Sequence, residues 1–515
     1  MSDELNQVQQ VRRNKLALLR AKGIEPYAYA FERSHKATGA AEVFAEAEQG
    51  DQLPEDGYGP EVTVAGRLMS IRGHGKSAFA HIEDVSGQIQ IYFKKNLLGD
   101  EAFEDLDLLD LGDWIGIRGA LFRTRTGEIT VRVAEWSLLS KSLRPLPLGK
   151  TEVNEETGER ITHSGFADTE VRYRQRYADL AVNPEVREVF RARSRTIREL
   201  RAFMDAHEFL EVETPALQPL YGGAMARPFE THHHTLDRTM YLRIADELYL
   251  KRLIVGGMER VYEICKDFRN EGVDRFHNPE FTMLEFYMAF TDYHGLMDLT
   301  EAMLSSVARA VTGSTALVYQ GESISFEPPF ARVSMISSLS EAMGFDAADA
   351  TREQLYEKAE ASGIEGLEGA GRGKLFDKLF GGMVQPKLIQ PTFVMDHPRE
   401  ISPLAKVKRG DPSVVERFEL FVAGEEIANA YSELNDPIDQ RARFEAQVEL
   451  RAAGDDEAHE VDEDYLRAME YGMPPTGGLG LGVDRFVMLL TDQASIRDVI
   501  LFPVMRPEQR LEVDD

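Results

Sequence analysis

Two predicted strands joined by a charged loop most constrain the fold of this chain of 515 residues. Apolar and β-favouring side chains dominate residues 261–268 and 281–290, which predicts a strand in each segment. Residues 270–272 read Asn-Glu-Gly and residues 278–279 read Asn-Pro, which are typical of a loop. The chain is therefore expected to contain an antiparallel strand pair whose connection carries charged groups.

The second strand of this pair is expected to present a carboxylate and a phenol to one space. Its period of two places Met283, Glu285 and Tyr287 on the same face. A glycine-rich segment, GGLGLGVDR, follows about 200 residues later and ends at Arg485. Together these segments can hold a nucleoside triphosphate and an amino acid. For an isolated FRNEG segment, a surface ion pair between Arg269 and Glu271 remains the alternative interpretation.

The overall charge restricts the nucleic acids that the chain can bind. The formal net charge is -29, whereas binding to a phosphate backbone requires local Lys and Arg. Residues 172–201 carry nine arginines against four acids, so a local basic patch is one interpretation. A solvated helix face with neighbouring ion pairs is the other interpretation.

Cysteine usage and hydropathy indicate the compartment. Cys265 is the single cysteine, which excludes a disulfide framework and a multi-cysteine zinc site. The first residues contain no apolar core of signal-peptide length, and no window approaches 18 consecutive apolar residues. We expect a soluble, cytoplasmic protein without a membrane span.

Changes in pattern divide the chain into four segments. Residues 1–60 predict a helical extension, and residues 61–140 contain five short alternating runs that suit a closed OB-type barrel. Residues 141–180 predict a polar linker that contains an insertion near 150–166. Residues 181–515 predict a larger α+β domain with a helical insertion at about 330–410.

Long motifs in the larger domain resemble those of class II aminoacyl-tRNA synthetases. The FRNEG and HNPEFTMLE run resembles their motif 2, GGLGLGVDR resembles motif 3, and residues 195–215 resemble motif 1. The segments GGAMARPF, YLRIADELYLKRL and AYSELND narrow the resemblance to the lysyl-tRNA synthetase family. This resemblance implies an N-terminal OB-fold β-barrel and an α+β catalytic domain built on an antiparallel sheet.

The resemblance also implies an activity and a nucleotide site. Such enzymes join L-lysine to ATP, giving lysyl-adenylate and pyrophosphate, and then transfer lysine to the 3′ end of tRNA(Lys). Arg269 and Arg485 are implied as the catalytic residues. The implied ATP-binding residues are Arg269, Glu271, His277, Phe281, Glu419 and Arg485.

A magnesium site is implied at Glu419 and Glu426. The two positions are roughly symmetric about Ala423-Gly424, so they can face one another across a hairpin and supply the oxygen ligands that Mg²⁺ prefers. A solvated pair of carboxylates is the alternative interpretation of this pattern.

Lysine recognition requires negative charge for the side-chain ammonium and a separate site for the α-ammonium. Asn429, Tyr431 and Glu433 share strand parity and are expected to project from one face. By the resemblance, Glu433 and Tyr287 hold the side-chain ammonium. The full implied lysine-binding set is Gly223, Glu247, Glu285, Tyr287, Asn429, Tyr431 and Glu433.

The barrel is implied to read a uridine-rich anticodon. The positions that match the reading set of the family are Arg72, Phe79, Gln90 and Glu135. Phe79 would stack on a base, because stacking on an aromatic side chain suits any base. Without the resemblance, burial of Phe79 in the barrel core is the more frequent outcome for a strand aromatic.

Other interpretations remain open at this stage. An aspartyl or asparaginyl synthetase shares the three motifs, a lysine ligase that modifies a protein shares the catalytic domain, and a noncatalytic RNA-binding paralogue shares both folds. A homodimer is expected from motif 1, and the apolar helix face of Ile197, Leu200, Phe203 and Met204 allows it. The alternative is burial of that face within one subunit.

Two further patterns carry no independent site. GAGRGKLFD fails as a phosphate loop because Leu375 follows Lys374, where that motif requires Ser or Thr. The run His232-His233-His234 lacks a partner cluster for zinc, and adjacent strand residues point in opposite directions.

Overall fold

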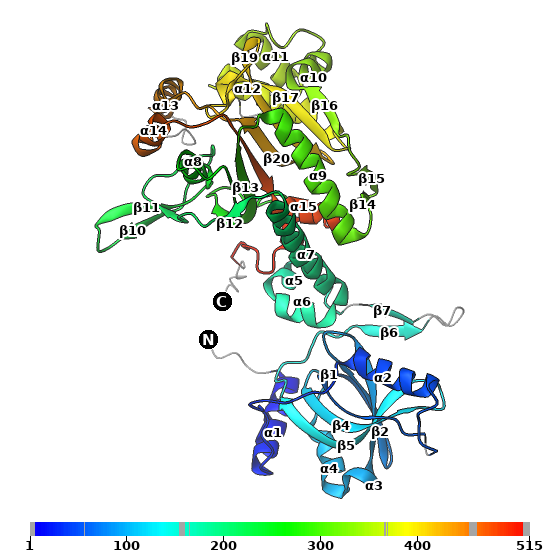
Figure 1. The fold of residues 1–515 in the computed structure, drawn as a ribbon. Helices are drawn as coiled ribbons and strands as arrows, with labels where there is room; N and C mark the ends of the chain where they lie inside the picture. Colours follow the sequence, from blue (N-terminus) through cyan, green and yellow to red (C-terminus); the bar gives the residue numbers. More distant parts are fainter. Residues whose placement is uncertain are drawn as a thin grey trace. The chain divides into compact units, whose positions relative to one another are not determined.

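A computed structural model describes residues 6–55, 57–153, 160–163, 165–364, 367, 369–452 and 461–507. The chain divides into two compact units, Met1–Ala167 and Asp168–Asp515, which are described separately (Figure 1). The second unit thus begins at Asp168 rather than near residue 181. The short helices α5 (Thr169–Arg174) and α6 (Arg176–Val182) belong to it because Arg176 donates to the carbonyls of Arg497 and Leu501.

The first unit contains the expected five-stranded barrel. Its strands are β1 (Glu61–His74), β2 (Ser77–Glu83), β3 (Gln88–Lys94), β4 (Trp114–Arg123) and β5 (Ile129–Ser140). They close in the order β1-β2-β3-β5-β4, and the β3–β5 pair is parallel. Alternate residues such as Val64, Ile91 and Val131 fill the interior, as the period of two predicts.

Helices flank this barrel, and a small hairpin follows it. These elements are α1 (Gln7–Ala21), α2 (Ala37–Gln49), α3 (Lys95–Leu98), α4 (Asp100–Glu104), the 3₁₀ helix η1 (Asp105–Leu108), β6 (Lys150–Val153) and β7 (Arg160–His163). A capping box between Asn6 and Gln9 starts α1. Phe44 of α2 and Leu19 of α1 join the barrel core, which shows why the first residues are helical.

A large sheet organises the second unit. Its strands are β8 (Leu210–Glu211), β12 (Arg260–Phe268), β13 (Glu280–Ala289), β16 (Ala331–Ser334), β17 (Thr392–Pro398), β18 (Val407–Lys408), β19 (Asp411–Val422), β20 (Glu425–Ser432) and β21 (Thr476–Gly482). Their order is β16-β17-β19-β20-β21-β13-β12-β8, with β18 beside β19. Only the outer pairs β16–β17 and β12–β8 are parallel, so the antiparallel prediction holds for the centre.

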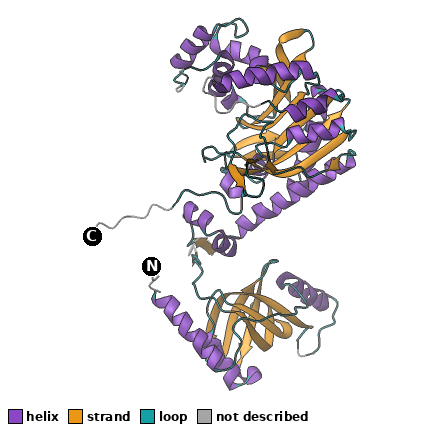
Figure 2. Ribbon diagram, turned by 90° about the vertical axis from the view of Figure 1, so that its left-hand side faces the viewer, coloured by secondary structure: helices purple, strands orange, loops and turns teal. Residues whose placement is uncertain are grey.

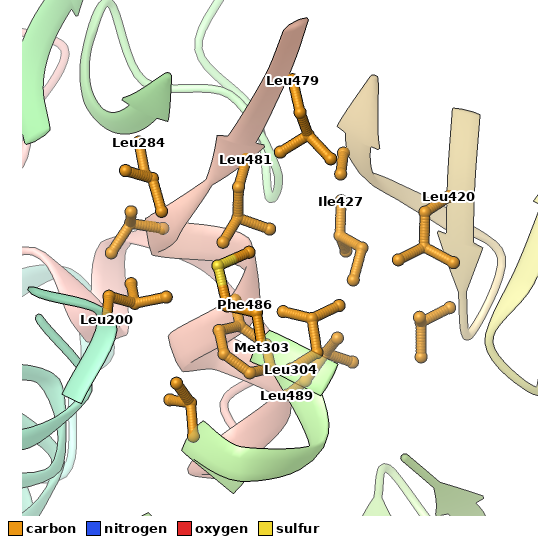
Figure 3. Close-up of a cluster of buried hydrophobic side chains, with 14 of the residues drawn as sticks. Leu200, Leu284, Met303, Leu304, Leu420, Ile427, Leu479, Leu481, Phe486 and Leu489 are labelled. Atoms are coloured by element: carbon orange, nitrogen blue, oxygen red, sulfur yellow. The ribbon is translucent and has the colours of Figure 1, made fainter. Parts of the chain in front are cut away.

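Three helices cover one face of this sheet, where purple helices lie against orange strands in Figure 2. They are α7 (Pro184–Ala206), α9 (Tyr293–Thr312) and α15 (Val483–Leu490). In Figure 3, Leu284, Leu481 and Leu420 of three different strands converge on Phe486 and Met303. Since Leu284 enters this core, alternation directs its neighbour Glu285 to the opposite face.

The remaining elements lie around this frame. The helices are α8 (Glu247–Val255), α10 (Met335–Met343), α11 (Arg352–Ala361), α12 (Arg372–Met383), η2 (Gln385–Lys387), η3 (Arg399–Ile401), α13 (Pro437–Ala452), α14 (Glu463–Glu470) and α16 (Ile496–Val499). The strands are β9 (Leu217–Gln218), β10 (Glu230–His233), β11 (Arg238–Leu242), β14 (Ala316–Tyr319) and β15 (Glu322–Ser325). Helices α10 to α12 separate β16 from β17 in sequence, within the region predicted to be a helical insertion.

Two surface predictions read differently in the structure. Leu200 and Met204 of α7 are fully buried in the core of the second unit, as the alternative interpretation of this face predicted, whereas Ile197 and Phe203 are partly buried. Ion pairs hold many arginines of residues 172–201, including Arg176 with Asp179 and Arg193 with Asp484. The ion-paired alternative therefore describes this region better than a free basic patch.

Among the residues that the structure describes, no helix combines the length and the apolar character needed to cross a bilayer.

Candidate functional site

A cavity of about 380 Å³ opens on the sheet face opposite the helix-covered core. Strands β13, β21 and β20 form its floor, and the loop between β12 and β13 forms part of its wall. Of the residues predicted to bind ATP or lysine, only Glu419 and Glu433 do not line it, and each of these contacts a lining residue, Arg417 and Ala405 respectively. The lining members are Gly223, Glu247, Arg269, Glu271, His277, Phe281, Glu285, Tyr287, Asn429, Tyr431 and Arg485, and the predicted metal ligand Glu426 lines the cavity as well.

Glycines of the middle strand make room for this cavity. Gly478 lies between Tyr287 and Tyr431 in the strand register, and Gly480 lies between Glu285 and Asn429. A Cβ atom on Gly478 would collide with Glu433 Oε1 and with the ring of Tyr287. The glycine pattern of β21 therefore serves close approach of side chains from both neighbouring strands.

The β12–β13 connection places cations and an aromatic ring at one part of the cavity. The guanidinium carbon of Arg269 lies 5.0 Å from the centroid of the Phe281 ring. His277 Nδ1 donates to Asp274 at 2.8 Å, which leaves Nε2 to accept from Arg485 at 3.1 Å. The structure thus joins residues of two motifs that are about 200 positions apart in sequence.

Acidic and phenolic groups occupy another part of the cavity. Tyr431 donates to Glu247 Oε2 at 2.7 Å, and Tyr287 donates to Glu285 Oε2 at 3.2 Å. Burial and then the neighbouring carboxylates raise the pKa of both phenols, so they remain neutral donors. Gly223 sits beside Glu247 with φ 92°, a backbone conformation that favours glycine.

Glu433 lies just outside the strand that was predicted to carry it. Strand β20 ends at Ser432, and the Glu433 backbone instead donates to the carbonyl of Thr476 at 2.8 Å. Its side chain is 1% exposed and forms an ion pair with Lys251. Lys251 was missed by the sequence analysis, although it follows Glu247 at helical i,i+4 spacing.

A cluster of buried carboxyl groups beneath Glu285 was also missed. Asp246, Asp267 and Glu285 lie close together, and Arg243 pairs with Glu263 and Asp267 at their edge. Burial, followed by the charge of Asp267, raises the pKa of Asp246 to about 8. Burial and Asp246 likewise raise the pKa of Glu285. Because these residues come from a loop and two strands, sequence spacing alone does not bring them together.

The predicted symmetry of Glu419 and Glu426 is wrong in its register. The turn pairs Val422 with Glu425 and therefore Phe421 with Glu426, and a bulge that adds one residue to β20 then places Glu419 opposite Asn429. Burial raises the pKa of Glu419 to about 8, with further contributions from Glu426 and Asp377. Arg417 binds Glu419 at 2.6 Å, and Glu419 itself does not line the cavity.

The two glutamates nevertheless fit a divalent cation. Burial, and to a smaller extent repulsion by Glu426, raises the pKa of Glu419, and a bound cation would offset both. Mg²⁺ commonly takes one or two carboxylates and completes its shell with phosphate oxygens and water. Glu426 also lies next to Arg485, whose Nη1 donates to the Glu426 carbonyl at 2.5 Å.

The barrel presents a separate aromatic surface in the first unit. Phe79 is 38% exposed and its ring centroid lies 4.6 Å from that of Tyr92, so it is not part of the core. Arg72 pairs with Phe79 in the strand register. Gln90 donates to Glu128 Oε2 at 2.7 Å.

Glu135, the acidic residue predicted for this surface, does not belong to it. Glu135 binds Arg118 at 2.9 Å, and it lies five positions along β5 from Thr130, the partner of Gln90. Glu128 is the acid that contacts Gln90 and also His81. It lies just before β5, where the sequence pattern alone did not distinguish it.

The buried cluster beneath Glu285 predicts a pH-dependent stability. Because folding raises the pKa of Asp246 from 3.8 to about 8, the folded state loses stability as pH rises through that window. Asp246→Asn removes this loss, so its melting temperature relative to the native chain should increase from pH 5 to pH 8. A gain of several degrees or more is expected, since each pH unit of this window is worth about 1.4 kcal/mol and about 1 kcal/mol corresponds to roughly 2–4 °C.

Thermal unfolding in matched buffers measures this difference. Asp349→Asn, at an exposed position of the same unit, is the control and should show no pH-dependent gain. A uniform loss of stability for Asp246→Asn at every pH would contradict the assignment.

Two known families match the two units. The family described as tRNA synthetases class II (D, K and N) matches residues 168–506. The family described as OB-fold nucleic acid binding domain matches residues 62–139.

Curated relatives match nearly the whole chain. A lysine–tRNA ligase of Pelotomaculum thermopropionicum is 54% identical over 511 residues, covering 98% of this chain and 96% of the relative. That of Carboxydothermus hydrogenoformans is 53% identical, with 98% and 99% covered, and that of Oceanobacillus iheyensis is 51% identical, with 98% and 100% covered. The chain therefore belongs to the lysine–tRNA ligase family of class II tRNA synthetases.

Proposed function

We propose that this chain is a ligase that activates L-lysine with ATP and then transfers lysine to the 3′ end of tRNA(Lys). The observation that carries the proposal is one cavity lined by Arg269, Arg485 and His277 together with the buried carboxylates Glu247 and Glu285, while a third buried carboxylate, Glu433, lies against its wall at Gly478. Cations suit the phosphates of a nucleotide, and the carboxylates suit a substrate with two ammonium groups. The relatives named above support the same activity.

Adenylate formation needs positioning and charge stabilisation rather than a covalent nucleophile. An oxygen of the lysine carboxylate attacks the α-phosphorus of ATP, the bond from that phosphorus to the bridging oxygen breaks, and pyrophosphate leaves. Arg269 would bridge the carboxylate and the α-phosphate with its planar guanidinium. Its place over Phe281 supports this role, because the ring limits the orientations that the guanidinium can take.

The other nucleotide contacts follow from the loop and from β21. Phe281 and Arg485 would lie on the two faces of adenine, and Glu271 would accept from its amino group. His277 and Arg485 would face the terminal phosphates, which the hydrogen bond between them supports. When bound, magnesium would neutralise charge on the departing pyrophosphate, with Glu419 and Glu426 as its protein ligands.

Different carboxylates would bind the two ammonium groups of lysine. Glu433 and Tyr287 would hold the side-chain ammonium, while Glu247, Glu285 and the backbone of Gly223 would hold the α-ammonium. Asn429 and Tyr431 complete the wall, and the Tyr431 hydrogen bond to Glu247 orients that carboxylate. A buried carboxylate left without a cation is costly, so uncharged analogues should be rejected.

The barrel would supply recognition of the anticodon of tRNA(Lys). Phe79 would stack on a base, and Arg72, Gln90 and Glu128 would address base edges near it. Exposure of Phe79 beside Tyr92 supports this role. Glu135 has no role in this proposal because Arg118 binds its side chain.

Assembly and location complete the proposal. A homodimer is proposed from motif 1. The proposed interface is the edge of the large sheet, where the exposed Leu210 lies on the short outer strand β8. The single cysteine suits a reducing cytoplasm.

The rival activities gain no support from these observations. Three carboxylates in the amino-acid part of the cavity disfavour aspartate or asparagine as substrate. The presence of the barrel disfavours a ligase that acts on a protein, and a complete set of cavity residues disfavours a noncatalytic paralogue.

Lysine-dependent exchange of pyrophosphate into ATP tests the activation step. Glu433→Gln should raise the lysine KM by roughly 100-fold, because losing one partner of a buried charge pair costs about 3 kcal/mol. The ATP KM should change by less than about twofold. Equal increases in both constants would refute the assignment of Glu433.

Transfer to a tRNA with a UUU anticodon tests the second step. Failure of the native chain in exchange would indicate a noncatalytic protein, and failure in transfer alone would indicate a protein substrate.

The magnesium assignment predicts a separate response. Glu419→Gln should raise the Mg²⁺ concentration for half-maximal exchange about tenfold, because a neutral amide is a weaker ligand than a carboxylate. The lysine KM should remain unchanged. Asp411→Asn, at the exposed start of the same strand, is the control, and an unchanged Mg²⁺ requirement in Glu419→Gln would exclude this ligand.

The anticodon assignment predicts a defect confined to tRNA. Phe79→Ala should lower kcat/KM for transfer by about tenfold to a hundredfold, since stacking on one base is worth about 1–3 kcal/mol. Pyrophosphate exchange should be unchanged. Tyr29→Ala removes another exposed aromatic ring of the same unit and serves as the control; an equal defect there would rule out stacking at Phe79.

A further inference from the structure

Lys251 is a buried cation beside the acidic part of the cavity. It lies on α8 with 0% of its surface exposed, and its Nζ forms ion pairs with Glu247 and Glu433. Three phenol rings surround the same atom at 5.5–5.9 Å from their centroids. These rings belong to Tyr287, Tyr431 and Tyr465.

The surroundings of Lys251 keep it charged. Burial by itself lowers the pKa of the ammonium, but Glu247 and then Glu433 raise it above its ordinary value. The aromatic faces add a favourable interaction with a desolvated cation. None of the steps described above uses this group.

Lys251 changes the charge balance of the cavity. The cavity takes three carboxylates, Glu247, Glu285 and Glu433, whereas lysine brings two ammonium groups. The resident cation offsets one negative charge of the Glu247 and Glu433 pair and leaves one for an ammonium group of the substrate, while Glu285 belongs to the Asp246 cluster. Without it, two buried carboxylates would face one another with no cation between them, and one would retain a proton.

Lys251 also determines which oxygen of Glu433 faces the substrate. Its Nζ forms an ion pair with Oε2, whereas no ion pair is formed by Oε1, and neither oxygen has a hydrogen-bond partner among the residues that the structure describes. Oε1 lies where a Cβ atom of Gly478 would sit, and Gly478 lines the cavity. Oε1, which Lys251 does not bind, is therefore the oxygen that lies against the cavity wall at Gly478.

We propose that Lys251 is a positioning residue that determines specificity: it holds Glu433 by one oxygen and adjusts the charge of the pocket to that of lysine. This inference rests on the proposed function. Lys251 touches neither ATP nor the reacting carboxylate, so it acts through Glu433 and Glu247.

The proposal has a consequence for pH dependence. Several titratable groups face Glu433 from four elements, and Lys251 is the only cation in that set. They are Glu247 and Lys251 of α8, Glu285 and Tyr287 of β13, Tyr431 of β20 and Tyr465 of α14. Removing Lys251 should raise the pKa of Glu433. Glu433 would then keep its proton up to a higher pH, and the incoming ammonium group of lysine would have to displace that proton.

Lys251→Met in the full-length chain tests this proposal by pyrophosphate exchange between pH 6 and pH 9. The lysine KM should rise about tenfold or more, and the ATP KM should change by less than about twofold. The midpoint of the acid limb of kcat/KM for lysine should move up by about one pH unit, which corresponds to that tenfold change. A loss of packing alone would not move this midpoint.

Two further variants complete the design. Arg252→Met removes the neighbouring cation of α8, which pairs with Asp462 instead, and should leave the lysine KM and the midpoint unchanged. Lys251→Met with Glu247→Gln removes the unbalanced charge, so it should be more thermally stable than Lys251→Met and should return the midpoint towards the native value. If Lys251→Met alone does not fold, recovery of a folded chain in the double variant is the measurement that tests the charge imbalance.

Distinct results overturn the inference and the proposed function. An unmoved midpoint in Lys251→Met, or a double variant no more stable than the single one, would overturn the role of Lys251 while native exchange persists. Absence of lysine-dependent exchange in the native chain would overturn the proposed function itself.

Discussion

The close approach of three strands at two glycines is the constraint on which the site depends. Gly478 and Gly480 occupy the centre of the sheet, and side chains from β13 and β20 fill the space above them. The same strand directs Leu479 and Leu481 into the core on the other face. One segment thus combines a packed core with a cavity, because alternate residues of a strand face opposite sides.

Charge compensation is the second organising feature of the cavity. Carboxylates are buried at several points, and each group is accompanied by an arginine, a lysine, a phenol or a further carboxyl group that holds a proton. Lys251 between Glu247 and Glu433 is the fully enclosed example, and the Asp246 cluster is the least compensated one. Burial of these carboxylates leaves unfavourable electrostatic interactions in the cavity, and a cationic substrate can relieve them.

Sequence reasoning succeeded where a pattern is local. The five barrel strands, the β12–β13 pair and the side chains of Arg269, Glu285 and Tyr287 follow from periodicity and turn signals. It failed where one inserted residue changes the strand register, or where the interaction partner of a residue lies far away in the sequence. The bulge in β20 moved Glu419 opposite Asn429, and Glu128 rather than Glu135 met Gln90.

By itself, the sequence determined the two folds, the motifs and most of the residues that line the cavity, since these depend on short-range spacing and on long matching segments. Only the tertiary structure decided how those residues meet. It brought Arg485 to His277, turned Glu433 towards Gly478 after the end of β20, and enclosed Lys251 between two carboxylates. Those contacts join elements far apart in the chain, and their geometry depends on sheet register and core packing, which no local pattern specifies.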